Sequence, residues 1–119
     1  MIAVIFEVTP HPDHYDEYLA TAADLRPILE GMDGFISIER FESLTTEGKV
    51  LSLSFWRDED AVKAWRNVPE HRVAQNEGRN RIFADYRLRV AGVIRDYGME
   101  PRDQAPADSL SHHAQNTKD

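Results

Sequence analysis

The chain has 119 residues, contains no cysteine and carries a formal net charge of −7 at pH 7. Its length fits a single domain, and the missing cysteine excludes disulfides, thiolate metal sites, iron–sulfur clusters and a cysteine nucleophile. The negative charge argues against nucleic-acid binding, and no apolar run is long enough for a membrane span. The absence of cysteine and of a leader-like start favours a cytoplasmic location.

The first half of the chain predicts a strand, a helix and a β-hairpin. Residues 2–8 alternate and are rich in β-branched and aromatic side chains, which is typical of a strand. Pro12 fits a first helical turn, and over residues 15–29 apolar side chains recur at spacings of three and four, as on one face of a long helix. Residues 35–42 and 50–56 then read as two strands joined by a glycine-containing turn.

The second half predicts two short helices and a last strand. Asp58 is a suitable N-cap for a helix that runs through Trp65. Pro69 fits the first position of a second helix, which Gly78 ends. Residues 84–97 alternate again and predict a long fourth strand.

This order predicts an α+β fold of the ferredoxin-like βαββαβ type, with a four-stranded antiparallel sheet and its helices on one face. Residues 1–98 would form this domain. Residues 99–119 contain too few apolar side chains to offset their ordering entropy and are expected to be a polar tail. Because both faces of the strands carry apolar residues, we expect a homodimer whose two sheets face each other.

One set of side chains could form a ligand pocket, at the break between the two short helices. Trp65 and His71 flank this break, and Trp56 ends the third strand nearby. Aromatic walls with one imidazole suit a flat aromatic substrate, and His71 could accept a proton from a phenol or enol. The alternative is that Trp65 is ordinary core and His71 makes a local hydrogen bond.

Further candidates for this pocket lie later in the chain. Phe83 and Tyr86, at the start of the last strand, would line it. The basic residues between 57 and 95 are almost all arginine, and Arg72 or Arg87 would hold an anionic substrate group. The alternative is that these arginines pair with acidic residues of the first half. No metal site is predicted, because the spacing His11-x-x-His14 has no third ligand.

Several stretches of the sequence match one known family. Gly34–Ser37, the run from Leu51 to Arg66, Glu70-His71 and Tyr86–Val90 resemble the antibiotic biosynthesis monooxygenase (ABM) domain family, over about residues 1–98. The resemblance implies a dimeric α/β barrel. Some members oxidise phenolic polyketides or quinols with O₂ and without flavin, metal or haem, and others bind and degrade haem.

The resemblance also assigns roles. Trp65 matches the family's helix tryptophan, and His71 falls where members carry a histidine or another polar ring. Members with either activity use an asparagine at or before the tryptophan's helix, whereas this chain has none before Asn67. The leading hypothesis is a monooxygenase of small aromatic or quinol-like substrates that needs no cofactor, with His71 as base and Trp65 as pocket wall. The alternatives are a non-catalytic dimer that binds a small hydrophobic ligand or is purely structural, and, third, a haem binder.

Overall fold

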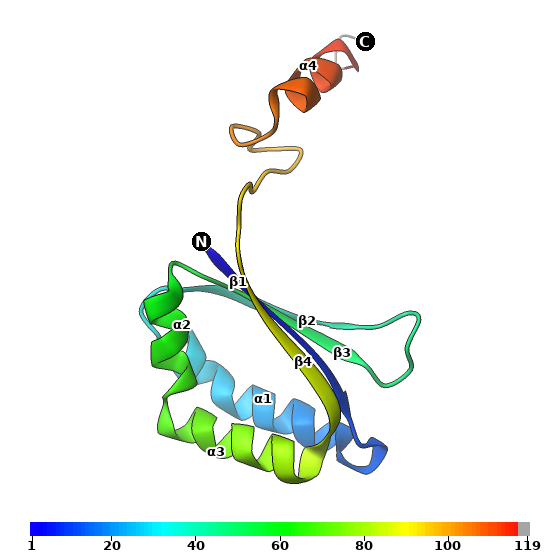
Figure 1. The fold of residues 1–119 in the computed structure, drawn as a ribbon, viewed down its shortest axis with the longest axis vertical. Helices are drawn as coiled ribbons and strands as arrows, with labels where there is room; N and C mark the ends of the chain where they lie inside the picture. Colours follow the sequence, from blue (N-terminus) through cyan, green and yellow to red (C-terminus); the bar gives the residue numbers. More distant parts are fainter. Residues whose placement is uncertain (117–119) are drawn as a thin grey trace.

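The computed structural model describes residues 1–116 and contains a four-stranded antiparallel sheet with the strand order β2-β3-β1-β4. The α+β ferredoxin-like fold is therefore confirmed. Figure 1 shows the helices α1, α2 and α3 gathered on one side of this sheet. The elements are β1 (Ile2–Pro10), the 3-10 helix η1 (Pro12–His14), α1 (Tyr15–Glu30), β2 (Phe35–Glu42), β3 (Val50–Trp56), α2 (Glu59–Arg66), α3 (Pro69–Glu77), the π-helical turn η2 (Gly78–Ile82), β4 (Phe83–Gly92) and α4 (Ala107–Asn116).

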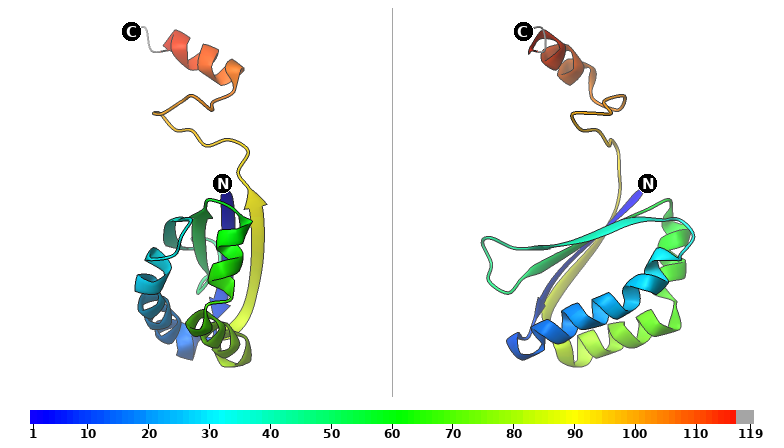
Figure 2. Two further views of the ribbon diagram at one scale, coloured as in Figure 1. Left: turned by 90° about the vertical axis from the view of Figure 1, so that its left-hand side faces the viewer. Right: turned by 180° about the vertical axis from the view of Figure 1, so that it is seen from behind.

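Strand β3 shows which face of the sheet meets the helices. Every second residue from Val50 to Trp56 is buried, and the residues between them are only partly buried. Val50 lies opposite Val8 of β1, which in turn lies opposite Tyr86 of β4, so these three side chains share the helix-covered face. The other face carries the alternate residues and has no cover from residues 1–116 in the views of Figure 2.

The core between sheet and helices has two parts, one at each end of α1. Near its start, Tyr18 packs with a group of buried residues from the strand ends and η2: Val8, Val50 and Ile82. Near its end, Leu29 packs with buried residues of β3 and α2: Trp56, Ala61 and Val62. Trp65 is partly buried against this second cluster.

Local sequence explains how α2 is positioned. The Asp58 carboxylate accepts a hydrogen bond from the backbone N–H of Ala61 at 2.9 Å and so caps the helix, as predicted. Gly34 approaches the same turn with a φ of +83°, and a Cβ there would lie 2.6 Å from the Ala61 Cβ. Only glycine allows this combination of backbone conformation and close approach.

The predicted last strand is too long. β4 ends at Gly92 rather than at residue 97. Its partner β1 begins at Ile2, which lies opposite Gly92, and the Val93 N–H makes one more bond, to the Met1 carbonyl at 3.0 Å. Beyond this point residues 1–116 offer no strand to pair with, and an extended segment without a partner is not a strand.

The tail contains a helix that was not predicted. α4 covers Ala107–Asn116 and lies well away from the sheet in all views (Figures 1 and 2). The prediction missed it because Leu110 is the one large apolar residue in this helix, so the hydrophobic periodicity is weak. Across residues 1–116, every helix is too short or too polar to cross a membrane.

Candidate active site

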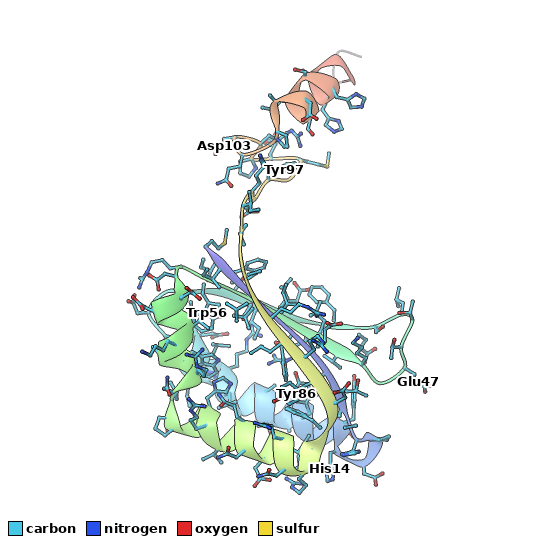
Figure 3. The ribbon with its side chains drawn as sticks, in the orientation of Figure 1. His14, Glu47, Trp56, Tyr86, Tyr97 and Asp103 are labelled. Carbon is cyan, nitrogen blue, oxygen red and sulfur yellow. The ribbon has the colours of Figure 1, made fainter. Side chains whose placement is uncertain are left out.

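Two stacked rings bridge the break between α2 and α3. Trp65 lies near the end of α2, and His71 lies in the first turn of α3. Pro69 starts α3 after a sharp change of direction, which turns His71 back over Trp65, so that their ring centroids are 4.2 Å apart at an angle of 20°. Trp56 continues the stack from the sheet, with its ring centroid 6.5 Å from that of Trp65. Figure 3 shows Trp56 beside α2. These three predicted residues are brought together.

The hydrogen bonds of His71 indicate which ring nitrogen is available. Nδ1 lies 3.0 Å from the backbone oxygen of Trp65. A carbonyl oxygen only accepts, so when this hydrogen bond is formed Nδ1–H donates and the neutral ring keeps its lone pair on Nε2. Nε2 makes no hydrogen bond to any residue among 1–116, so its lone pair is free to accept a proton.

The surroundings keep His71 uncharged near neutral pH. Burial lowers the pKa of the imidazole below its ordinary value of 6.5, because the charged form loses solvation. The nearby Arg72 charge lowers this pKa further, while the bond to the Trp65 carbonyl raises it and opposes both effects in part. A half-buried, neutral imidazole with a free lone pair has the properties of a general base.

Two predicted wall residues belong to the other end of the core. Phe83 packs against Phe6 and Tyr18, with ring centroids 5.7 and 5.8 Å away, respectively. Tyr86 lies 5.8 Å from both Phe6 and Phe83, also measured between centroids. Both rings are on the helix-covered face, but in the cluster around Tyr18 and not beside Trp65.

The two predicted arginines are also placed differently from each other. Arg72 lies beside His71 in α3, where its guanidinium donates to the side-chain oxygens of Asn67 at 2.8 Å and Gln75 at 3.0 Å. Arg87 lies opposite Glu7 in the register and thus on the uncovered face of the sheet. The sheet separates Arg87 from His71, so the structure does not bring this predicted anion ligand to the site.

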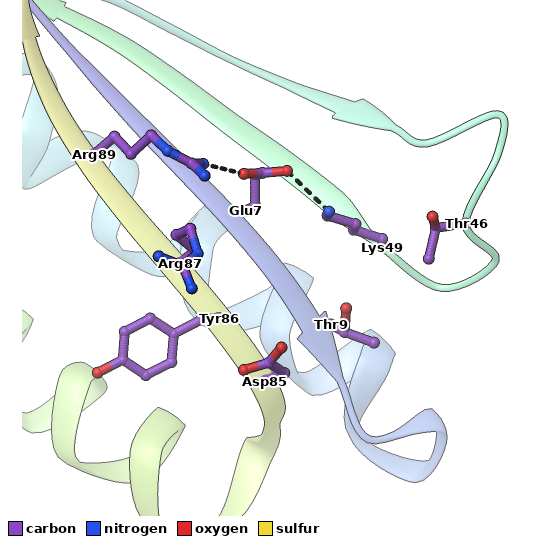
Figure 4. A pocket seen from close by; sticks show the side chains of 8 residues that line it. All are labelled: Glu7, Thr9, Thr46, Lys49, Asp85, Tyr86, Arg87 and Arg89. Atoms are coloured by element: carbon purple, nitrogen blue, oxygen red, sulfur yellow. Dashed lines mark hydrogen bonds and ion pairs between the residues drawn. The ribbon is translucent and has the colours of Figure 1, made fainter.

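Arg87 instead lines an open hollow of about 350 Å³ on the uncovered face. There Glu7 forms ion pairs with Lys49 at 2.8 Å and with Arg89 at 2.5 Å (Figure 4). The predicted pairing of arginines with acidic residues of the first half is therefore seen for Arg89, and also for Arg81, which pairs with Glu17.

The prediction overlooked Gln75. Its amide nitrogen lies 3.3 Å from Nδ1 of His71, the same atom that contacts the Trp65 carbonyl. The spacing of four residues from His71 could have revealed it, because residues i and i+4 of a helix are neighbours.

No metal site is found in the described part of the chain, since residues 1–116 contain no group of three or more His, Asp or Glu side chains that could hold an ion. Of the His11-x-x-His14 pair, His14 is bound to the carboxylate of Glu17, with 2.9 Å between Nδ1 and Oε2.

Comparison with known proteins places this geometry in context. The chain is 50% identical over 93 residues to the jasmonate monooxygenase ABM of Pyricularia oryzae, which covers 78% of this chain and 43% of that protein. The chain thus spans less than half the length of this curated relative.

Solved structures share the fold at low identity. Rv0793 from Mycobacterium tuberculosis superposes with a TM-score of 0.73 at 18% identity, covering 82% of this chain and 98% of that one. SnoaB, a cofactor-independent oxygenase from Streptomyces nogalater, gives 0.69 at 13% identity, covering 80% and 94%. The sequence model of the antibiotic biosynthesis monooxygenase family matches residues 1–77. Because this match extends over well more than half of the sequence, the chain belongs to the antibiotic biosynthesis monooxygenase (ABM) family.

Proposed function

We propose that the protein is a monooxygenase that oxidises a small aromatic or quinol-like substrate with O₂ and without a cofactor. The observation that carries this proposal is the stacked pair of Trp65 and His71, with Nδ1 of His71 held by a backbone carbonyl and Nε2 free. The pair supplies a flat apolar wall and a neutral base at the same place. These are the two things that a substrate needs if its own anion is to reduce O₂.

The reaction balances without an external reductant when the oxidised carbon is an acidic CH₂ group. Nε2 of His71 takes one proton, the carbanion forms a C–O bond to O₂, and the imidazolium protonates the terminal oxygen to give a hydroperoxide. His71 then takes the second proton, the O–O bond breaks, and the carbon becomes a carbonyl while hydroxide is protonated to water. One oxygen atom enters the product, the other leaves as water, and the substrate supplies all four electrons.

Exposed apolar side chains indicate where the rest of the substrate would lie. On the helix side of the edge strand β4, Tyr86, Leu88 and Val90 are 40%, 52% and 44% exposed. Val90 lies opposite Val4, which packs against the same cluster as Trp65. We therefore propose that an aromatic substrate lies along β4 with its reactive end at His71, and that Arg72 acts on His71 rather than on the substrate.

We further propose that the protein forms a homodimer through the uncovered face of the sheet. Phe41 on β2 is 42% exposed on this face, next to Leu51 of β3, which is partly buried. The face is acidic on β2, at Glu39, and basic on β4, at Arg87. A second copy placed with its β4 over this β2 would cover the apolar side chains and match opposite charges. The absence of cysteine supports a cytoplasmic location for this dimer.

Oxygen uptake tests the function. The full chain would be incubated in air-saturated, chelator-treated buffer with a panel of dihydroxyanthracenes, anthrones and quinols, and with jasmonate because of the relative's name. We expect uptake of one O₂ per carbonyl formed with at least one aromatic substrate. His71→Ala should lower kcat/KM by about 10²- to 10⁴-fold, the usual contribution of a general base.

His11→Ala is the matched control, because the side chain of His11 is exposed and makes no capping bond. It should leave the rate unchanged. Equal rates for His71→Ala and wild type would contradict the role of the base. If substrates raise the melting temperature but no panel member is turned over, the domain is a ligand-binding module and not an oxygenase.

A further inference from the structure

Two groups near Nδ1 of His71 require opposite protonation states of that nitrogen. Nδ1 of His71 faces two groups, the backbone oxygen of Trp65 at 3.0 Å and the amide nitrogen of Gln75 at 3.3 Å. The carbonyl requires Nδ1 to carry a proton, whereas an amide N–H requires it to carry none. A ring nitrogen has one in-plane position, so the two hydrogen bonds exclude each other.

The orientation of the Gln75 amide is set by its other partners. Arg72 donates to its oxygen at 3.0 Å, and its nitrogen donates to the Arg66 carbonyl at 3.2 Å. Turning the amide over would place NH₂ against the guanidinium and an oxygen against a carbonyl. The network therefore directs an N–H, and not an oxygen, at His71. Arg72 is held in turn by Asn67, at 2.8 Å.

The Trp65 carbonyl does not depend on His71 for a hydrogen bond. The backbone N–H of Val68 already donates to it at 3.1 Å. When Nδ1 loses its proton, this oxygen therefore stays bonded, and Nδ1 can accept from Gln75 instead. In both arrangements Nδ1 of His71, the nitrogen of Gln75 and the Trp65 carbonyl each keep a partner, so neither has a large energetic advantage.

We propose that Gln75, oriented by Arg72, is a positioning residue that keeps both neutral tautomers of His71 accessible. With the proton on Nδ1, His71 donates to Trp65 and presents a lone pair on Nε2. With the proton on Nε2, His71 accepts from Gln75 and presents a donor. The same ring can then accept a proton from the substrate in one form and donate a hydrogen bond to a substrate oxygen in the other, without leaving its stack on Trp65.

This inference deepens the proposed function, in which His71 is the base, but its test does not depend on turnover. In the ligand-free full chain with ¹⁵N-labelled histidine, the two ring-nitrogen shifts above the pKa report the tautomer ratio. In the wild type we expect averaged values for Nδ1 and Nε2. In Gln75→Met, which keeps the length but has no N–H, the ratio should move about fivefold toward the Nδ1–H form, the effect of losing one ordinary hydrogen bond.

Two further variants test whether Arg72 acts by orienting the Gln75 amide or through its own charge. Arg72→Met frees the Gln75 amide to turn its oxygen to Nδ1–H, so it should move the ratio the same way. In the Gln75→Met background, Arg72→Met should change the ratio much less, because no amide remains for Arg72 to orient. Asn76→Ala, at the exposed neighbouring position of α3, is the control.

Other results would overturn the proposal. It fails if Gln75→Met folds and leaves the ratio as in wild type, or if Arg72→Met shifts the ratio equally in both backgrounds. Gln75→Glu gives an independent arm should Gln75→Met not fold, because its carboxylate accepts from Nδ1–H and must enrich that tautomer. A shifted ratio in a protein that consumes no O₂ would refute the oxygenase function and leave the role of Gln75 standing.

Discussion

The chemistry of His71 depends on the ring that covers it. Burial is the largest cause of its lowered pKa, and the stacked Trp65 ring, with centroids 4.2 Å apart, covers one face of the imidazole. Replacing Trp65 with leucine opens one face of the imidazole to water. A better-solvated imidazolium is more stable, so the pKa should rise toward 6.5.

An NMR titration of the His71 ring measures this effect. We expect Trp65→Phe, which keeps an aromatic face, to shift the pKa less than Trp65→Leu does. The unchanged far-UV spectrum of both variants would show that the fold persists. An identical His71 pKa in wild type and Trp65→Leu would mean that stacking does not tune the base.

Some residues of the candidate active site could be placed from the sequence alone. The short spacing across Pro69 was enough to place Trp65 beside His71. Arg87 could have been excluded, because it follows Tyr86 directly in a strand and adjacent strand residues face opposite sides of the sheet. The distance of Phe83 from Trp65 was not predictable from the sequence, because it depends on which end of β4 lies next to α2.

In the π-helical turn η2, Gly78 has no side chain, and this lets the first residue of β4, Phe83, pack closely against the turn. A Cβ on Gly78 would lie 2.4 Å from the ring of Phe83. Gly78→Ala should therefore displace Phe83 from Phe6 and lower the free energy of unfolding by about 1–3 kcal/mol, as overpacking does.

Denaturant unfolding provides the measurement, with Gly92→Ala as the matched control, because nothing lies within 4 Å of a Cβ at Gly92. That control should stay within about 0.5 kcal/mol of wild type. If the two variants are equally stable, the contact between Gly78 and Phe83 does not constrain the fold.

The elements were largely predictable where the cause is local. The residues 35–42 and 50–56 and the N-cap at Asp58 agree with the structure. The end of β4 was not predictable, because a strand ends where its neighbour ends, and that is a property of the pairing with β1. Helix α4 was missed because its sequence has little amphipathic pattern.

For the whole molecule, the main expectation is self-association through the uncovered sheet face. A positive charge at Phe41 would be buried against the basic strand β4 of the second copy in the proposed dimer, which is strongly unfavourable. Phe41→Lys should therefore sediment as a folded monomer at micromolar concentration, where the wild type sediments as a dimer.

Leu44→Lys introduces the same charge in the nearby hairpin turn, at a fully exposed side chain, and should remain dimeric. A monomeric wild type would contradict the proposed interface. A dimer that survives Phe41→Lys would mean that the copies associate through another surface.

If neutral His71 is the base for an O₂-dependent oxidation, the pH dependence of kcat/KM must follow the titration of its ring. Because the pKa of His71 lies below 6.5, the ring is neutral at pH 7, and the rate should be constant there and fall only as the pH drops through that pKa. We expect this acidic limb to coincide with the NMR titration of His71 and to disappear from the residual activity of His71→Ala. A limb that lies above 6.5, or one that persists unchanged in His71→Ala, would show that His71 is not the base.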